Sequence, residues 1–200
     1  MVSIDTSGKF CSISISSSDN IKYSIISKKP LSHSIDLGVN LNKILTKYNI
    51  SIKDLDFIAI NIGPGSFTGL RIGVSFAKGL CLSNNIPLIP INSFEIIDSK
   101  IKCEKDIFYY GVYSHKNFFY GVQYVENIPS TPRLMNLENR KDGPIYIFGL
   151  EEKAQFGNDI IHIDYNSSDL IDIALEKNQN KSYDDLNSIH PIYIDYNETA

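Results

Sequence analysis

The sequence predicts an α/β protein of two sub-domains, and three parts of its pattern support this fold class. Short strand-like runs open the chain with turn residues between them, which indicates an antiparallel meander. Strand–helix units follow, as in layered α/β folds. A second hairpin after residue 105 then begins a second half. We therefore expect an N-terminal lobe at residues 1–104 and a smaller C-terminal lobe at residues 105–200.

The hydrophobic periodicity of the first half predicts its elements in order. Strands are expected at residues 2–5, 11–16, 21–26, 56–62 and 86–91. Helices are expected at residues 34–48, 66–83 and 93–102. Apolar and polar residues alternate in the second strand, which is typical of a half-buried strand. The fourth strand is almost continuously apolar, as expected when both faces of a sheet are covered. Ser51 and Asp54 between helix and strand fit a capping box with Asp in place of Glu.

The second half begins with an aromatic-rich hairpin and becomes more polar toward its end. Strands are expected at residues 107–113, 118–124, 145–148 and 160–163. A helix is expected at residues 168–176. The chain after residue 178 is polar and weakly patterned until a short apolar run at residues 191–194.

The composition limits the classes of function that the chain can serve. Its 200 residues carry a net charge of −4 and no basic patch, so if the chain serves a nucleic acid we expect it to do so only through a partner. The three cysteines form no CxxC pair, which favours a reduced intracellular setting. We find neither a signal-peptide pattern nor an apolar run of ~18–20 residues, so we expect a cytoplasmic protein with no membrane contact. No cofactor or metal is expected.

The most informative segment is the glycine-rich turn before the helix at residues 66–83. Gly63, Gly65 and Ser66 follow a buried strand, and Ser66 is a candidate N-cap. Free amides at such a helix start can bind an anion, although a structural turn is the favoured interpretation. The segment is not a P-loop, because Leu70 and Arg71 follow Gly69 where a Lys-Ser/Thr pair is needed. A weak nucleotide contact is also considered for the first turn of the chain, at Asp5, Thr6 and Ser7.

Small residues recur every four positions along the same helix. They are Gly65, Gly69, Gly73, Ala77 and Cys81. Each helical glycine costs about 0.5–1 kcal/mol relative to Ala, so the stripe requires a compensating contact. Close packing on the chain's own sheet and a helix–helix contact, either within the chain or with another subunit, are both left open. Apolar residues such as Phe67 and Leu70 lie on the other side, so this helix is expected to have two partners.

The order and spacing of several motifs resemble the TsaB (YeaZ) family. The similar segments are Ile4–Ser7, His33-Ser34, Ser51–Asp56 and the long block Gly63–Gly79, all within residues 1–98. The resemblance implies an actin, Hsp70 and sugar-kinase type of fold with two related α/β lobes. It also implies a platform protein that partners the paralogue TsaD and the ATPase TsaE. That complex transfers a threonylcarbamoyl group to the adenosine 3′ of the anticodon in tRNAs that read codons beginning with A.

The resemblance further implies where the subunits meet. In the family, the first two helices of the N-terminal lobe form the homodimer face and the TsaD-binding face. On this sequence those helices are residues 34–48 and 66–83. The residues predicted to form the interface are Leu37, Leu41, Leu45, Gly65, Phe67, Gly69, Leu70, Gly73 and Ala77.

The residues give no support for catalysis by this chain. TsaD-like proteins place two metal-binding histidines in an Asn-His-x-x-x-His segment, and the matching positions here are Ser93 and Ile97. The four histidines of the chain are scattered, and no GxSxG elbow is present. We therefore predict no catalytic residues and a non-enzymatic subunit. The alternatives are an actin-fold ATPase or kinase and a peptidase-like hydrolase.

The second half departs from the family pattern at two places. Tyr113-Ser114-His115 stands where TsaB-like chains usually have Asp-Ala-Arg. Pro191-Ile-Tyr-Ile-Asp195 replaces a Pro-x-Tyr-Leu-Arg ending. Both changes remove an arginine, which puts in doubt any role of those arginines in this chain.

Overall fold

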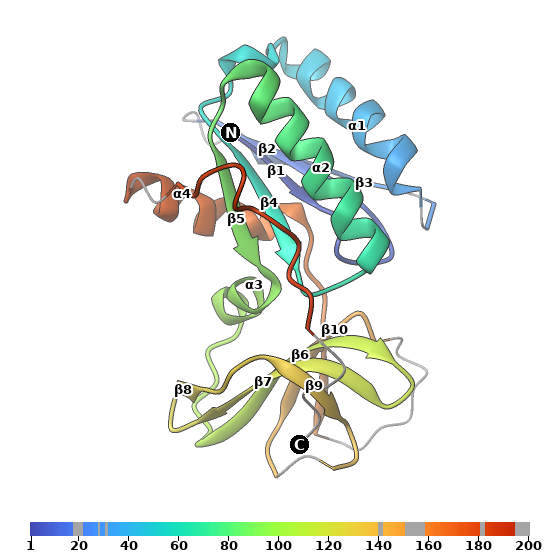
Figure 1. Ribbon diagram of the computed structural model, residues 1–200, viewed down its shortest axis with the longest axis vertical. Helices are drawn as coiled ribbons and strands as arrows, with labels where there is room; N and C mark the ends of the chain where they lie inside the picture. The colour runs from blue at the N-terminus through green and yellow to red at the C-terminus, as the bar shows by residue number, and fades with distance from the viewer. Residues whose placement is uncertain are drawn as a thin grey trace. The chain divides into compact units, whose positions relative to one another are not determined.

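The computed structural model describes residues 1–17, 22–27, 29–30, 32–139, 142–150, 159–180 and 183–194. By their internal contacts these residues fall into two compact units, each with its own sheet (Figure 1). Unit 1 comprises Met1–Asn92 and Asn166–Ile192, and unit 2 centres on Ser93–Tyr165. This grouping differs from the predicted ranges 1–104 and 105–200, because the helix after residue 92 belongs to unit 2 and the chain after residue 165 returns to unit 1.

The sheet of unit 1 contains five strands in the order β3-β2-β1-β4-β5. The strands are β1 (Val2–Asp5), β2 (Ser12–Ser16), β3 (Lys22–Ile26), β4 (Ile58–Gly63) and β5 (Leu88–Asn92). The first three form the predicted antiparallel meander, while β4 pairs in parallel with both β1 and β5. In the register, Ile4 of β1 lies between Ile13 and Ile60, which lines up apolar side chains on one face.

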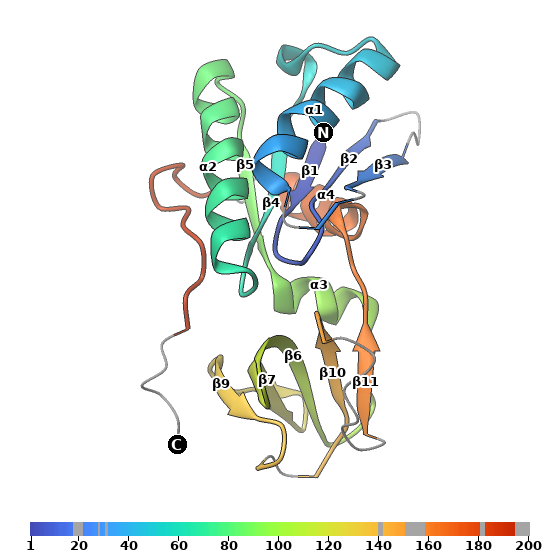
Figure 2. The same cartoon turned by 90° about the vertical axis from the view of Figure 1, so that its right-hand side faces the viewer.

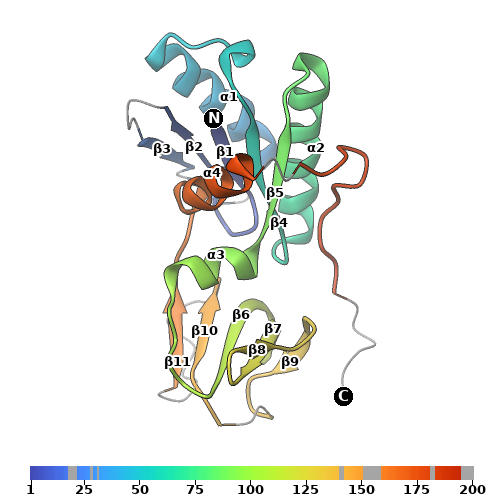
Figure 3. The same ribbon diagram turned by 90° about the vertical axis from the view of Figure 1, so that its left-hand side faces the viewer.

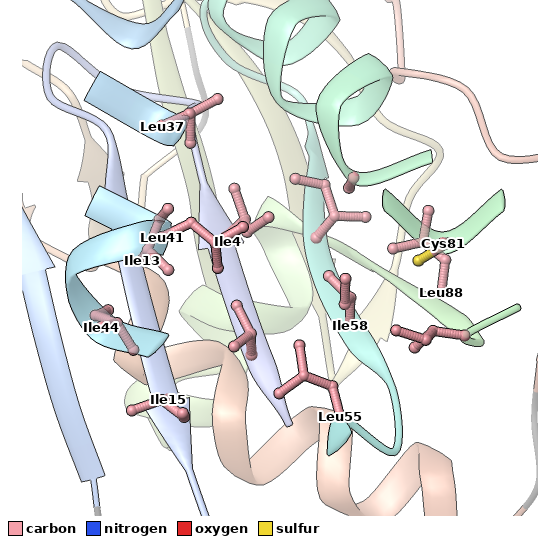
Figure 4. Close-up of a cluster of buried hydrophobic side chains, with 14 of the residues drawn as sticks. Ile4, Ile13, Ile15, Leu37, Leu41, Ile44, Leu55, Ile58, Cys81 and Leu88 are labelled. Carbon is pink, nitrogen blue, oxygen red and sulfur yellow. The ribbon is translucent and has the colours of Figure 1, made fainter. Parts of the chain in front are cut away.

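Helices α1 (His33–Tyr48) and α2 (Phe67–Asn84) pack side by side on that apolar face (Figure 2). Between them, the short helix η1 (Ile52–Asp54) carries the predicted capping box, in which Ser51 and Asp54 each accept a backbone N–H. Figure 4 shows the buried cluster that results, with Leu37 and Leu41 of α1 directed at Ile4 and Ile13 of the sheet. None of the described helices combines the length and apolar character needed to cross a membrane.

The second face of this sheet is covered as well, by η2 (Ser167–Leu170) and α4 (Ile171–Gln179) (Figure 3). The expectation of a half-buried β2 is therefore wrong, since every residue of this strand is buried. Its serines bond to η2: Ser14 Oγ lies 2.6 Å from Ser167 Oγ, and Ser12 Oγ accepts the Ser167 N–H at 2.8 Å. Small hydroxyls that bond to one another can be buried without leaving unsatisfied polar groups.

The sheet of unit 2 repeats the plan of the first. Unit 2 begins with helix α3 (Ser93–Lys100). Its strands are β6 (Ile107–His115), β7 (Phe118–Val125), β8 (Ile128–Pro129), β9 (Arg133–Asn136), β10 (Ile145–Phe148) and β11 (Ile160–Ile163). The path β9-β7-β6-β10-β11 has an antiparallel meander followed by two parallel strands, as β3-β2-β1-β4-β5 does. The sequence predicted this sheet except for β8 and β9. The apolar run at residues 191–194 forms no strand; its Ile192 N–H donates to the Ile62 carbonyl at 2.7 Å.

Candidate functional site

The glycine-rich turn joins β4 to α2 with the geometry that its sequence indicated. Gly63 has φ +97°, a left-handed conformation that favours glycine, and the Gly63–Pro64 peptide is cis. Ser66 is the N-cap of α2, and its side chain accepts the Gly69 N–H at 3.2 Å. Its own N–H donates to the Ser7 carbonyl at 2.7 Å. The predicted N-cap is confirmed, and the turn is fixed against the loop that follows β1.

That loop begins with a buried carboxyl group. Asp5 Oδ1 accepts hydrogen bonds from the Ser7 N–H at 3.0 Å, the Ser7 hydroxyl at 2.7 Å and the Asn61 amide at 3.0 Å. Burial raises the pKa of Asp5 above its ordinary value, and the hydrogen bonds from Ser7 and Asn61 act in the opposite direction. Asp5 and Ser7 are thus bonded to each other inside unit 1.

Backbone N–H groups of Gly63, Ser66 and Gly69 around the turn donate to acceptors within the unit. The Gly63 N–H donates to Asn61 Oδ1 at 2.8 Å, in addition to the bonds made by the Ser66 and Gly69 amides. These contacts agree with a structural turn. An anion or nucleotide contact at Asp5–Ser7 and Gly63–Ser66 stays a prediction.

The stripe of small residues faces inward. A Cβ atom at Gly69 would lie 2.1 Å from the Thr6 carbonyl oxygen, and one at Gly73 would lie 2.2 Å from Thr6 Oγ1. A Cβ atom at Gly65 would lie 2.7 Å from Ser7 Cβ. Since real Cβ atoms are essentially never closer than 3.0 Å to such neighbours, only glycine lets α2 approach the loop after β1. These contacts agree with close packing of the stripe inside the chain, which is one of the interpretations left open by the sequence.

Most of the residues predicted to form an interface are also inside unit 1. The buried ones are Leu37, Leu41, Leu45, Gly69, Leu70, Gly73 and Ala77, and Gly65 is half-buried. These residues give a partner little or no exposed surface to contact. Phe67 is 54% exposed, and the Arg71 guanidinium lies 3.8 Å from the centre of its ring.

A different set of residues lies on the outside of the two helices. We call it the outer face, and it consists of Ile35, Gly38 and Val39 of α1 with Phe67, Gly79 and Leu82 of α2. Ile35 is 71% exposed and Leu82 is 77% exposed. A Cβ atom at Gly38 or Gly79 would meet nothing within 4 Å. Of the residues on this face, sequence reasoning named only Phe67, and it missed the others because it followed the stronger inner stripes.

The positions that correspond to metal ligands in TsaD-like proteins lie on α3. Ser93 and Ile97 are both buried there, and neither side chain is a usual metal ligand. In the described part of the chain, no three His, Cys, Asp or Glu side chains come together as a metal site would need. His115, in place of the family's arginine, bonds through Nδ1 with the neighbouring Ser114 hydroxyl at 3.0 Å. Of the family's C-terminal motif, Asp195 lies outside the described residues.

Comparison with known proteins gives relatives over the whole chain and over its first half. The family described as "TsaD: tRNA N6-adenosine threonylcarbamoyltransferase" matches residues 27–109. A TsaB protein of Buchnera aphidicola from Schizaphis graminum is 35% identical over half of this chain and 47% of its own length. A second TsaB protein, from Buchnera of Acyrthosiphon pisum, is 26% identical over 96% of this chain and 97% of its own length.

The same resemblance appears in solved structures. YeaZ from Pseudomonas aeruginosa has a TM-score of 0.77 and covers 96% of this chain and 98% of its own, at 17% identity. This likeness shows the fold, and the repeated strand order within the chain agrees with it. The predicted fold class, two related α/β lobes, is confirmed. The resemblance to the TsaB (YeaZ) proteins is confirmed by the sequence relatives.

Proposed function

We propose, from the premise that this chain is TsaB-like in sequence and fold, that it is a non-catalytic subunit in threonylcarbamoyladenosine synthesis on tRNA. In this proposal it works in the cytoplasm with a TsaD-type transferase and a TsaE-type ATPase, and touches tRNA only through them. The complex modifies the adenosine 3′ of the anticodon in tRNAs that read codons beginning with A. When alone, the chain forms a homodimer.

The observation that carries the non-catalytic role is the pair Ser93 and Ile97. The segment that matches the TsaD family, residues 27–109, includes both positions. The buried Ile97 side chain has no atom that can bind a metal, and the buried Ser93 hydroxyl is a poor substitute for imidazole. A chain that keeps the TsaD-like glycine block without these ligands fits an assembly role better than a catalytic one.

The outer face is the surface we propose for contact with partners. When another protein covers exposed apolar side chains such as Ile35 and Leu82, their removal from water lowers the free energy of the complex. Gly38 and Gly79 are exposed helical glycines with open space around them, so packing inside the unit does not explain them. Each costs about 0.5–1 kcal/mol relative to Ala, and close approach of a second helix would compensate for this.

Mixing this chain with a TsaD-type transferase and measuring complex mass by light scattering after size exclusion tests the proposal. A complex at micromolar concentration is expected, and its absence would refute the scaffold role. Val39→Asp places a charge on the outer face and should weaken association at least about tenfold, because an unpaired charge is costly to bury. Ile161→Asp in unit 2 is the matched control, since Ile161 is 40% exposed and Val39 is 48% exposed. Equal loss in both variants would exclude the outer face as the contact.

A further inference from the structure

Unit 2 contains an aromatic cluster that the proposed function does not use. Phe108 and Tyr110 are two residues apart in β6, so their side chains lie on the same face of the sheet. Tyr124 of β7 lies opposite Phe108 in the register. The Phe108 and Tyr124 rings are stacked with centres 4.6 Å apart. The Tyr110 ring lies 4.9 Å from that of Tyr124 and 5.2 Å from that of Phe108, tilted against both. The three rings thus form one continuous aromatic wall.

A pocket of about 350 Å³ lies between this wall and the end of α3. Its volume falls at the lower end of the range for small-ligand sites, about 300–1,000 Å³. Beside the rings it is lined by the side chain of Asp98, the segment Ile101–Cys103 and Asn127. The Tyr110 hydroxyl is buried and donates to the Ile101 carbonyl at 3.0 Å. Burial, with a further contribution from the Asp98 carboxylate, raises the pKa of Tyr110, so the phenol stays neutral.

The electrostatics of the pocket favour a positive ligand. Asp98 lies in the last turn of α3, where the free carbonyls of a helix carry partial negative charge. A carboxylate at this position destabilises the helix, so helix stability does not explain the presence of Asp98, whereas contact with a positive ligand would. The faces of aromatic rings also attract cations. Lys102 opposes this attraction in part, because its side chain is exposed and solvent reduces the effect of its charge without removing it.

We propose that this pocket binds the guanidinium group of an arginine side chain presented by a partner protein. A guanidinium is planar and weakly hydrated, so it stacks on an aromatic wall while its N–H groups donate to a carboxylate. The ammonium of lysine is a compact and strongly hydrated charge that cannot make both contacts equally well. The Asp98 carboxylate is the acceptor, and the half-buried ring of Tyr124 is the stacking surface, since Phe108 and Tyr110 behind it are almost fully buried.

The test is an amide NMR titration of the full chain with Nα-acetyl-arginine amide at physiological salt. Saturable shifts are expected at Lys102, Tyr110 and Asn127, and the matching lysine amide should bind more weakly. Asp98→Asn should lower the affinity about tenfold, as the loss of a charge-assisted hydrogen bond does. Asp106→Asn is the control, because it makes the same change of charge at an exposed residue outside the pocket. Lys102→Gln should raise the affinity about two- to fivefold by removing a like charge.

Several outcomes would overturn the proposal. They are the absence of saturable shifts at the pocket, equal effects of Asp98→Asn and Asp106→Asn, lysine amide binding as tightly as arginine amide, and a Lys102→Gln variant that binds no more tightly. The amide spectrum of each free variant shows whether it is folded. Asp98→Asn is expected to fold, since it removes an unfavourable charge from the end of α3.

Discussion

Replacing Gly69 by Ala adds one methyl group at the tightest contact of α2. The new Cβ atom would lie 2.1 Å from the Thr6 carbonyl oxygen, which belongs to the backbone and is fixed next to β1. The helix or the loop therefore has to move. The same change at Gly79 is a matched control on the same helix, because a Cβ atom there meets nothing within 4 Å.

The expected magnitudes have opposite signs at the two positions. Ala in place of a helical glycine stabilises by about 0.5–1 kcal/mol, and Gly79→Ala should show this gain in full. Forced overpacking costs about 1–3 kcal/mol, and a contact with rigid backbone should fall at the upper end of that range. Gly69→Ala should therefore lower the free energy of unfolding by about 2 kcal/mol once the helical gain is subtracted.

Urea unfolding followed by far-UV circular dichroism measures both changes as shifts of the midpoint at constant slope. A second comparison isolates the contact at Gly73. A Cβ atom there would lie 2.2 Å from Thr6 Oγ1, so Thr6→Ala should relieve much of the cost of Gly73→Ala. If Gly69→Ala is as stable as Gly79→Ala, the inward stripe is not what holds α2 against the loop after β1.

Two further predictions concern the same loop and turn. Ser66→Ala removes the N-cap of α2 and should lower the free energy of unfolding in urea by about 1 kcal/mol. Ser75→Ala, at an exposed position of the same helix, should be nearly neutral. Equal effects of the two changes would contradict the capping role of Ser66. The raised pKa of Asp5 means that its contribution to stability is full below the ordinary aspartate pKa of about 3.9 and is lost as pH rises through the folded value. Asp5→Asn should therefore gain stability relative to the parent chain as the pH rises above about 4 in parallel urea titrations, and a constant difference would exclude the linkage.

The accuracy of the sequence predictions depended on how local their physical cause was. The capping box of Ser51 and Asp54 was predictable because both partners lie within one turn. The burial of Ser12 and Ser14 was not, since the covering residue Ser167 is remote in sequence and a serine alternation usually means solvent. Strand β9 (Arg133–Asn136) was missed because it contains no β-branched or aromatic residue, whereas β10 and β11, which are equally short, consist mainly of such residues.

The same limit explains what the sequence indicated about the site. A four-residue spacing of small side chains predicts that something approaches α2 closely, but it does not say whether that neighbour belongs to the same chain. The distances from Thr6 assign Gly69 and Gly73 to internal packing. Leucine at either position should accordingly damage the fold of the monomer before it affects any association.

Gly38 and Gly79 are the helical glycines at which contact of α1 and α2 with another protein can be tested. Because their surroundings are open, a variant such as Gly79→Ala separates two effects that usually change together. It should stabilise the isolated chain through helix propensity, and it should weaken association if a second backbone approaches the outer face. Loss of association in a chain that has become more stable cannot result from unfolding. Unchanged association would instead leave Ile35 and Leu82 as ordinary exposed residues and direct the search for partners to other surfaces.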